Sequence, residues 1–551
     1  MSITSASPAA IRIFRLHHRR RGAAGDRTTS SGRRFGPGEW SRPVLSVRAA
    51  VPAAAVAGLM LDGAFPAMGW WPLAWVSVVV SLVCLLGRSV GGAAVVGLVF
   101  GAAFFLTHLV WVAQFLGPVP WLALAGLQTV LLGLGAIAIS MVYRWSAWVW
   151  SGRRAQLLLV PVAVAATWTL RELVMGAWPY TGFPWARLAM TQVDGPPAQA
   201  VSWVGVSGLS FLIVLVCAAA VQWARVGGLG DVRSVVPAAA LAVALVAVPS
   251  FPTTPAGDLR VGWVQGNGPS AYFDDRSAGD VFAAQTAASA AVLGQDMDLL
   301  VWPEGGVDSD PLKDAATAAA LDDLVRRAGA PLLVNAATER DGKVFNTSML
   351  WTARADPQLH DKVNPVPFGE YVPDRWFFQR IVPDLVGLIR RDYSPGRLPP
   401  VVRVDGVRIG LAICFDVIFD DVIHDGARLG AGLYVFQTNN ADFRGTDENL
   451  QQLAFARMRA IETGRAVVNV STVGTSQVIS PDGSVLDAAG TNQAAARVTT
   501  VPVRTGQTPA TVVGSPLAAV IAAGALVAMA GLGLGYRQRR RGPTPRIGDR
   551  P

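Results

Sequence analysis

The chain has 551 residues, of which 52% are hydrophobic and 15% are charged, against roughly 25% charged in an average soluble protein. Its net charge of +9 is uneven, because residues 251–512 contain 31 of the 38 acidic residues whereas arginines gather at both ends. The acidic soluble region argues against a nucleic-acid partner. Three separated cysteines and five scattered histidines predict neither a metal site nor a cofactor.

Residues 1–46 are predicted to form a basic, disordered cytoplasmic tail, since they are rich in arginine and lack the apolar core of a signal peptide. Apolar segments long enough, or nearly so, to cross a hydrocarbon core of about 30 Å then follow at 47–62, 71–87, 91–114, 120–142, 156–176, 198–223 and 233–250. An eighth segment, 513–535, precedes a second basic tail at 536–551. We therefore predict a polytopic α-helical membrane domain of seven transmembrane helices at 47–250, a soluble domain at 251–512 and a C-terminal transmembrane helix.

Arginines mark alternate connections between the predicted helices. They occur in both tails, at Arg88, at Arg144, Arg153 and Arg154, and at Arg225 and Arg233, whereas the connections near 63–70 and 115–119 contain no basic residue. By the positive-inside rule, both termini are cytoplasmic and residues 251–512 lie outside. The pattern predicts a multi-pass protein of the plasma membrane, with the lipid bilayer as a partner.

One connection on the predicted outer side is long and aromatic. Residues 175–197 carry Trp178, Tyr180, Phe183 and Trp185. Aromatic side chains of this kind settle at the level of the lipid headgroups. Two interpretations remain open, an anchor in the interfacial belt or a lipid-facing wall of an active site held at the membrane surface.

The soluble region alternates strand-like and helical patterns. Strands are expected in "LRVGWVQGN", "DLLVWPE", "PLLVNAAT", "VRIGLAICF", "GLYVFQTNN" and "AVVNVSTVG", and helices within 277–295, 311–329 and 447–464. The alternation indicates an α/β layered domain around a largely buried sheet. Glu304, Cys414 and Asn439 each follow such a strand. Because ligands bind at the carboxyl ends of strands in open α/β sheets, these three residues predict a site there.

Cys414 is either a buried structural cysteine or a nucleophile. A nucleophilic thiol needs a base or a positive environment. A pairing with His424 or His360, as in papain-like enzymes, is open, but nothing in the sequence positions either histidine. Glu304 in "VWPEGG" is the better base, because burial behind an apolar strand raises the pKa of a carboxyl, although it could also be a solvated loop residue.

Lysine is rare, since the 47 basic residues include only Lys313, Lys343 and Lys362 besides arginines. Lys362 opens "KVNPVPFGEY", in which the prolines and glycine predict a rigid loop. Its compact ammonium could stabilise a developing oxyanion, and chance retention is the alternative.

The segments "WPEGG", "KVNPVPFGEY" and "ICFD" resemble the Glu-Lys-Cys motifs of the nitrilase (carbon–nitrogen hydrolase) superfamily. With the polytopic region and the segments "FPAMGWWPLA", "TGFPW", "FNTSML" and "ARMRAIETGRAVV", the chain is similar to the apolipoprotein N-acyltransferase family over about residues 50–535. The resemblance implies an extracytoplasmic nitrilase-like αββα sandwich beside about eight transmembrane helices, in the bacterial plasma membrane. It also implies that Glu304 is the general base, Lys362 the oxyanion-stabilising cation, Cys414 the nucleophile and Glu370 a supporting carboxylate.

The implied reaction is ping-pong acyl transfer through a thioester. A phospholipid would acylate Cys414, and the α-amine of a diacylglyceryl-cysteine at the N-terminus of an apolipoprotein would then take the acyl chain. For substrate contacts we predict residues in the aromatic connection and at the strand ends, namely Trp178, Phe183, Trp185, Phe415, Asp416 and Asn439.

Three positions depart from the family pattern. Asp416 stands where the family usually has glutamate, Pro365 stands where leucine is common, and Asp442 replaces a tryptophan.

Two other functions remain as alternatives. One is a membrane-tethered amidase or nitrilase, in which water completes the reaction. The other is a transporter or receptor, against which the spans offer few ionisable residues, chiefly Glu172 beside Arg171.

Overall fold

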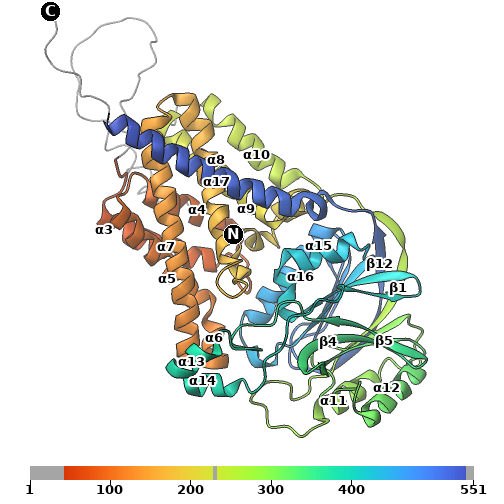
Figure 1. The fold of residues 1–551 in the computed structure, drawn as a ribbon. Coiled ribbons are helices and arrows are strands. Elements are labelled where there is room, and N and C mark those ends of the chain that lie inside the picture. The colour runs from red at the N-terminus through yellow and green to blue at the C-terminus, as the bar shows by residue number, and fades with distance from the viewer. Residues whose placement is uncertain (1–41, 228–231, 542–551) are drawn as a thin grey trace, which may run out of the picture. The chain divides into compact units, whose positions relative to one another are not determined.

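The computed structural model describes residues 42–227 and 232–541. The predicted tail at 1–46 lies almost wholly outside the described residues, as does most of the tail at 536–551. Each of the eight predicted spans corresponds to helix. The helices are α3 (Val47–Asp62), α4 (Pro72–Leu85), α5 (Val90–His108) with α6 (Val110–Leu116), α7 (Pro118–Val149), α8 (Arg153–Met175), α9 (Val201–Gln222), α10 (Val236–Ala247) and α17 (Pro509–Arg541) (Figure 1).

Five of the helical segments in the described residues are long and apolar enough to cross a membrane, namely 90–108, 118–149, 153–175, 196–226 and 509–541. Helices α3, α4 and α10 are shorter, with 16, 14 and 12 residues. The predicted count of eight spans therefore stays a prediction. The segment expected at 91–114 is divided at Leu109 into α5 and α6, and α17 continues past 535 to Arg541.

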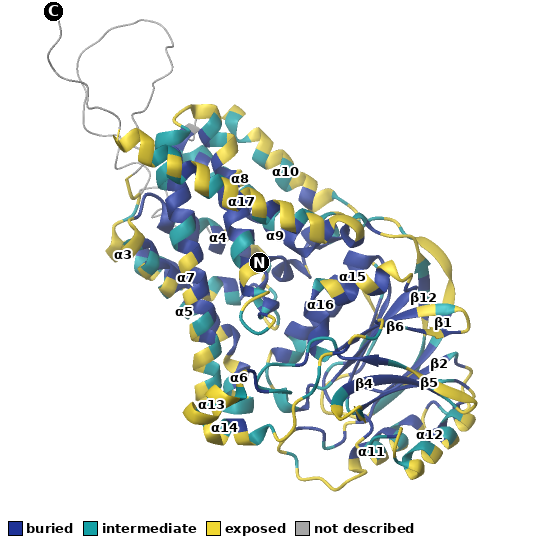
Figure 2. Ribbon diagram, viewed as in Figure 1, coloured by how far each residue is buried: buried dark blue, intermediate teal, exposed yellow. Residues whose placement is uncertain are grey.

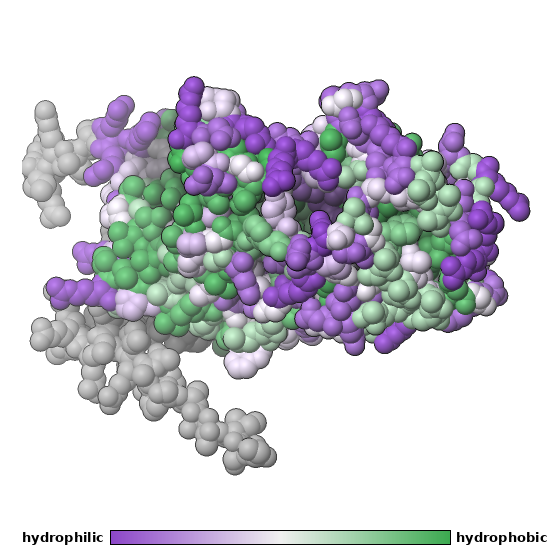
Figure 3. All heavy atoms as spheres, turned by 90° about the horizontal axis from the view of Figure 1, so that it is seen from below, coloured by the Kyte–Doolittle hydropathy of each residue, from purple (hydrophilic) through white to green (hydrophobic). Residues whose placement is uncertain are grey.

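Small residues bring the helices close together. A Cβ atom on Gly97 of α5 would lie 2.4 Å from the Cβ of Ala136 on α7, so only glycine permits this approach. Apolar side chains cover much of the helical part on the face seen in Figure 3, bordered by polar ones. Exposed large apolar residues in these helices include Leu59, Leu98, Leu134, Val243 and Val527, as expected for surfaces that face lipid.

The soluble region forms two six-stranded sheets. The first has the order β12-β1-β2-β3-β4-β5 and the second β11-β10-β9-β8-β7-β6. The strands of the first sheet are β1 (Thr254–Gln265), β2 (Leu299–Val301), β3 (Leu332–Arg340), β4 (Lys343–Thr352), β5 (Ala355–Asp361) and β12 (Ala495–Thr505). Those of the second are β6 (Val401–Val404), β7 (Val407–Ile413), β8 (Leu433–Thr438), β9 (Val467–Ser471), β10 (Gln477–Ile479) and β11 (Val485–Ala488).

In each sheet three strands run in parallel, β1-β2-β3 and β7-β8-β9, and antiparallel strands flank them. All six predicted strand segments are confirmed, as are the predicted helices, which are α11 (Asp280–Ser289), α12 (Ala315–Ala328) and α16 (Glu448–Thr463). The α/β layered domain is therefore confirmed.

The apolar cores define the layers. One cluster, which includes Val261, Leu411 and Val435, lies between the two sheets. A second joins the first sheet to α11 and α12. A third joins the second sheet, α15 (Asp420–Arg428) and α16 to the membrane helices, and Figure 2 shows α16 almost entirely buried. The result is an αββα sandwich in which one helical layer packs against the membrane domain.

Candidate active site

The thiol of Cys414 lies directly after a buried strand. Strand β7 ends at Ile413, and residues Cys414–Ile418 form a 3₁₀ turn. Cys414 has a φ angle of 49°, in the left-handed region that a non-glycine residue adopts only at an energetic cost. The cysteine is partly exposed, whereas Phe415, Asp416, Val417 and Ile418 are buried. The turn therefore holds the thiol at the surface of a tightly packed segment.

Lys362 lies between two carboxylates near this thiol. Its Nζ is 3.2 Å from Glu304 Oε1 and 2.9 Å from Glu370 Oε2. Glu304 follows β2 in the first sheet and Lys362 follows β5, whereas Cys414 follows β7 in the second sheet. The site therefore forms where the carboxyl ends of strands from both sheets meet.

Asn346 holds the two carboxylates in place. Its Nδ2 donates hydrogen bonds to Glu304 Oε1 (2.8 Å) and to Glu370 Oε1 (3.0 Å), and its Oδ1 accepts one from Asn335 (2.8 Å). Asn346 belongs to the family-like segment "FNTSML", but nothing in that segment marks it as a site residue. Its position on a strand next to the predicted base was not visible before the order of the strands was known.

Burial shifts the pKa values of all three groups at the site. Burial, together with the charge of Glu304, raises the pKa of the Cys414 thiol well above its usual value, so the resting thiol is protonated. Burial raises the pKa of Glu304 as well. Burial disfavours the Lys362 ammonium, but the charges of Glu304 and Glu370 outweigh it and raise the pKa of Lys362. The arrangement can combine a base, a fixed cation and a thiol.

Asp416 and Asn439 make contacts that stabilise loops. The carboxylate of Asp416 accepts hydrogen bonds from the backbone N–H groups of Val363 (3.0 Å) and Asn364 (2.8 Å), which follow Lys362. Asn439 donates to Ser270 O (3.1 Å) and accepts from Thr472 Oγ1 (2.7 Å). Both side chains have protein partners, and their contact with substrate stays a prediction. Asp416 instead ties the Cys414 turn to the Lys362 loop.

The aromatic connection reaches the turn that begins at Cys414. Phe183 stacks against Phe415 at 6.1 Å and against Trp185 at 5.7 Å between ring centroids. Trp185 is buried and donates a hydrogen bond to Gln451 Oε1 (2.7 Å), which also accepts one from Trp111 Nε1 (3.2 Å). Trp178, by contrast, is 59% exposed. The structure thus packs Phe183 against Trp185 and against Phe415, the residue that follows Cys414, whereas Trp178 lies largely exposed.

A chain of amides leads from the thiol to a second buried carboxyl group. Gln452 Nε2 donates to Cys414 Sγ (3.4 Å), and Gln452 Oε1 accepts from Asn440 Nδ2 (2.8 Å). The same Asn440 nitrogen donates to Glu448 Oε2 (2.8 Å). Glu448 and Gln452 lie in α16, whose only sequence signal is amphipathic spacing, and Asn440 lies in the loop after β8, so no motif singles these residues out.

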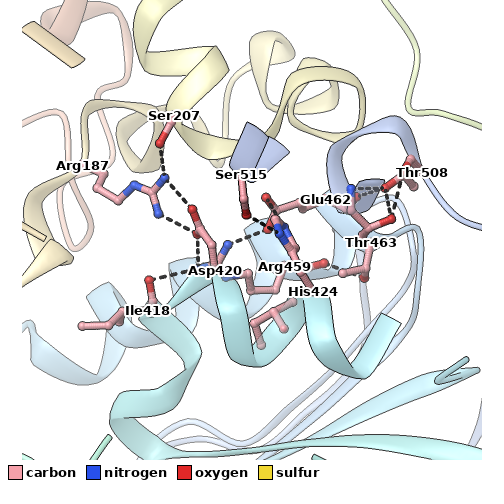
Figure 4. Close-up of polar contacts among 12 residues, drawn as sticks. Arg187, Ser207, Ile418, Asp420, His424, Arg459, Glu462, Thr463, Thr508 and Ser515 are labelled. Atoms are coloured by element: carbon pink, nitrogen blue, oxygen red, sulfur yellow. Dashed lines mark hydrogen bonds and ion pairs between the residues drawn. The ribbon is translucent and has the colours of Figure 1, made fainter. Parts of the chain in front are cut away.

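Figure 4 shows a buried polar network behind the turn that begins at Cys414. The Arg459 guanidinium donates to the carbonyl oxygens of Val417 (2.9 Å) and Ile418 (3.0 Å). It also pairs with Asp420 (2.8 Å) and Glu462 (2.5 Å). Arg459 is completely buried, so it links the turn to both helices of the adjoining layer.

The same network extends into the membrane domain (Figure 4). Asp420 pairs with Arg187 (2.6 Å), which donates to Ser207 of α9 (2.7 Å). His424 Nε2 contacts Glu462 (3.2 Å) and its Nδ1 contacts Ser515 of α17 (3.4 Å). Both ring nitrogens of His424 therefore have partners other than Cys414. His360 contacts the carbonyl of Leu398 (3.3 Å), so a pairing of either histidine with the thiol gains no support.

Comparison with protein families divides the chain in two. Residues 57–219 match the model of the apolipoprotein N-acyltransferase N-terminal domain, and residues 260–510 match the carbon–nitrogen hydrolase model. The first match covers most of the predicted membrane domain and the second covers the sandwich with Glu304, Lys362 and Cys414.

Two relatives that align with this chain over most of their length have the same name. The apolipoprotein N-acyltransferase of Mycolicibacterium smegmatis is 32% identical over 535 residues, covering 89% of this chain and 85% of the relative. That of Ralstonia nicotianae is 30% identical over 542 residues, covering 91% and 96%. Among solved structures, a CN-hydrolase superfamily protein from Xanthomonas campestris is 20% identical with a TM-score of 0.33, covering 53% of this chain and 100% of its own.

Proposed function

The chain belongs to the apolipoprotein N-acyltransferase family, and from this membership we propose that it transfers an acyl chain from a membrane phospholipid to the α-amine of a diacylglyceryl-apolipoprotein. Family membership indicates an acyltransferase with a lipoprotein substrate in a membrane environment. The proposal adds the phospholipid donor and a ping-pong mechanism through a thioester on Cys414. One observation carries it, the position of the Cys414 thiol beside the buried Glu304–Lys362–Glu370 cluster.

In the first half-reaction, Glu304 takes the proton of the Cys414 thiol. The thiolate attacks the ester carbonyl of the phospholipid, and the negative charge that develops on the carbonyl oxygen is stabilised by the Lys362 ammonium. The C–O bond then breaks, and the lysophospholipid leaves with the proton held by Glu304. An acyl thioester remains on Cys414.

In the second half-reaction, the amine of the lipoprotein attacks the thioester carbonyl. The C–N bond forms, the C–S bond breaks, and Cys414 recovers its proton. Transfer to an amine requires that water be kept from the thioester. Phe183, Trp185 and Phe415 form an aromatic wall beside Cys414 that suits this exclusion, and Trp111 and Gln451 hold Trp185 in place.

Glu370 is proposed as a supporting carboxylate. It pairs with Lys362 (2.9 Å) and accepts a hydrogen bond from the backbone N–H of Val366 (2.7 Å). With Glu304 on the other side of the ammonium, it fixes the direction in which Lys362 points. A lysine held between two carboxylates retains its charge, which oxyanion stabilisation requires.

We also propose that the sandwich lies outside the plasma membrane and that both termini are cytoplasmic. The alternation of arginine-rich connections supports this orientation. Both substrates would then lie in the outer leaflet, so the active site needs to reach only the membrane surface. The aromatic connection beside Cys414 is consistent with that position.

The test is mass spectrometry of the purified protein after incubation with phospholipid alone. We expect an acyl adduct that maps to Cys414 and is removed by neutral hydroxylamine. Cys84 and Cys217 are buried in the helical domain and serve as internal controls. A folded protein without the adduct, combined with full activity of Cys414→Ala, would refute the mechanism. Rapid loss of the adduct to water, without an amine, would instead indicate a hydrolase.

A further inference from the structure

Glu448 is a buried carboxyl group close to the nucleophile that the mechanism above does not use. It is 3% exposed and begins α16, one helical turn before Gln452, whose amide contacts Cys414 Sγ at 3.4 Å. Residues four apart on a helix project from the same face. The Glu448 carboxyl group therefore lies on the side of α16 that faces the thiol, and Asn440 links it to Gln452.

The surroundings of Glu448 lack a counter-charge. Glu304 and Glu370 share Lys362, and Asp420 and Glu462 share Arg459. In the described parts of the chain, 42–227 and 232–541, no lysine, arginine or histidine forms an ion pair with Glu448. A buried carboxylate without a cation is unfavourable. The other charged or titratable groups that act on Glu448 are Glu304, Asp442 and the Cys414 thiol.

We propose that Glu448 receives the α-ammonium group of the acceptor lipoprotein and takes its proton before the amine attacks the thioester. This inference rests on the proposed function and names the residue that recognises the second substrate. The ammonium would supply the missing cation in direct contact with the carboxylate. Asn440 keeps the carboxylate directed toward Gln452 and the thioester.

The proton and electron balance of the step is complete. The ammonium transfers one proton to the Glu448 carboxylate, and the nitrogen lone pair then forms the C–N bond with the thioester carbonyl carbon. When the C–S bond breaks, its electron pair returns to the Cys414 sulfur. A second proton passes from the nitrogen that has bonded to the carbonyl carbon to that sulfur, by way of Glu304. The amide product leaves, and Glu448 releases its proton to solvent.

The proton affinity of Glu448 suits this task. Burial raises its pKa to about 8, close to the value of roughly 7.7–8.0 for an α-amino group. A base works best when its pKa is near that of the acid and near the working pH.

The experiment separates the two half-reactions. The acyl-enzyme is accumulated from phospholipid alone and then mixed with a diacylglyceryl-cysteine peptide, and product formation is followed from pH 6 to 9. Glu448→Gln retains an oxygen that accepts the Asn440 hydrogen bond but cannot take a proton. Asp447→Asn is the matched control, because it removes the same charge from the neighbouring, exposed position.

We expect Glu448→Gln to form the acyl-enzyme at the wild-type rate and to transfer it to the peptide roughly 100-fold more slowly at pH 7. The rate should recover as the pH rises and the free amine becomes abundant. Transfer to hydroxylamine, which is neutral at pH 7, should be unchanged. Asp447→Asn should behave as wild type throughout.

Three results would overturn the inference. The first is transfer to the peptide by Glu448→Gln at the wild-type rate. The second is that this variant loses as much transfer to hydroxylamine as to the peptide. The third is that it forms the acyl-enzyme as slowly as it transfers the acyl chain. If Glu448→Gln does not fold, Glu448→Asp retains the base and should show slower transfer with the wild-type pH profile; a profile in which transfer recovers only at high pH in that variant would also overturn it. Failure of the wild-type protein to form any acyl-enzyme would instead refute the proposed function.

Discussion

Replacing Arg459 tests whether the buried network positions the nucleophile. Arg459 is completely buried and donates to the carbonyl oxygens of Val417 and Ile418 while pairing with Asp420 and Glu462. Arg459→Met keeps much of the volume but leaves both carbonyls and a buried carboxylate without this partner. Breaking one side of a buried ion pair destabilises a protein by about 3–5 kcal/mol.

The matched control is Arg457→Met on the same helix. Arg457 pairs with Asp194, but the two side chains are 25% and 45% exposed, and such pairs contribute about 0–1 kcal/mol. Arg459→Lys is a second comparison, because it keeps the charge but lacks the planar fork that reaches two carbonyls and two carboxylates at once.

The assays are the melting temperature of the detergent-solubilised protein and the rate at which phospholipid acylates Cys414. We expect Arg459→Met to melt well below Arg457→Met, with slower acylation at saturating phospholipid and little change in the phospholipid concentration needed for half-saturation. Arg459→Lys should recover more stability than acylation rate. Wild-type acylation and melting in Arg459→Met would show that the network does not position the turn.

Two further predictions concern the charged groups of the site. Lys362→Arg should lose most activity although the charge is kept, because the space between Glu304 and Glu370 fits a compact ammonium; near-normal turnover would contradict this role. The pKa of Glu448 is raised from 4.5 to about 8. The free energy of unfolding is therefore highest below pH 4.5, where the group is protonated in both states, and it falls as the pH rises through about 8. Relative to wild type, Glu448→Gln should therefore gain stability between pH 5 and 9, up to about 5 kcal/mol at 1.4 kcal/mol per pKa unit. Melting temperatures across this range are the measurement, and a constant difference between the two proteins would contradict the assignment.

The strands and helices of the sandwich were predictable because their signals are local. A run such as "RIGLAICF" is apolar and β-branched, and it lies in β7. The meeting of Glu304 and Lys362 could be expected only through the family resemblance, since they are brought together by the pairing of strands far apart in sequence. Contacts of this kind depend on sheet order, which periodicity does not encode.

The roles of Asp416, Gln452 and Glu448 could not be predicted from the sequence, for a different reason. Asp416 follows the nucleophile closely and therefore suggested a substrate contact, yet its partners are the backbone N–H groups of a loop 52 and 53 residues away. Glu448 and Gln452 have no motif of their own. They gain significance only because one face of α16 packs against the turn that carries Cys414.

The contacts of α17 have a consequence for biosynthesis. Thr508, just before this last helix, donates to the carbonyl of Glu462 (2.6 Å), and Ser515 contacts His424 (3.4 Å). These partners are synthesised after every strand of the sandwich and after the other described helices. The helical layer behind Cys414 thus stays incomplete until α17 has been synthesised and has packed against α15 and α16. A nascent chain that stalls before this helix would carry Glu304, Lys362 and Cys414 without the completed support for the Cys414 turn, which would delay the proposed thioester chemistry until α17 is in place.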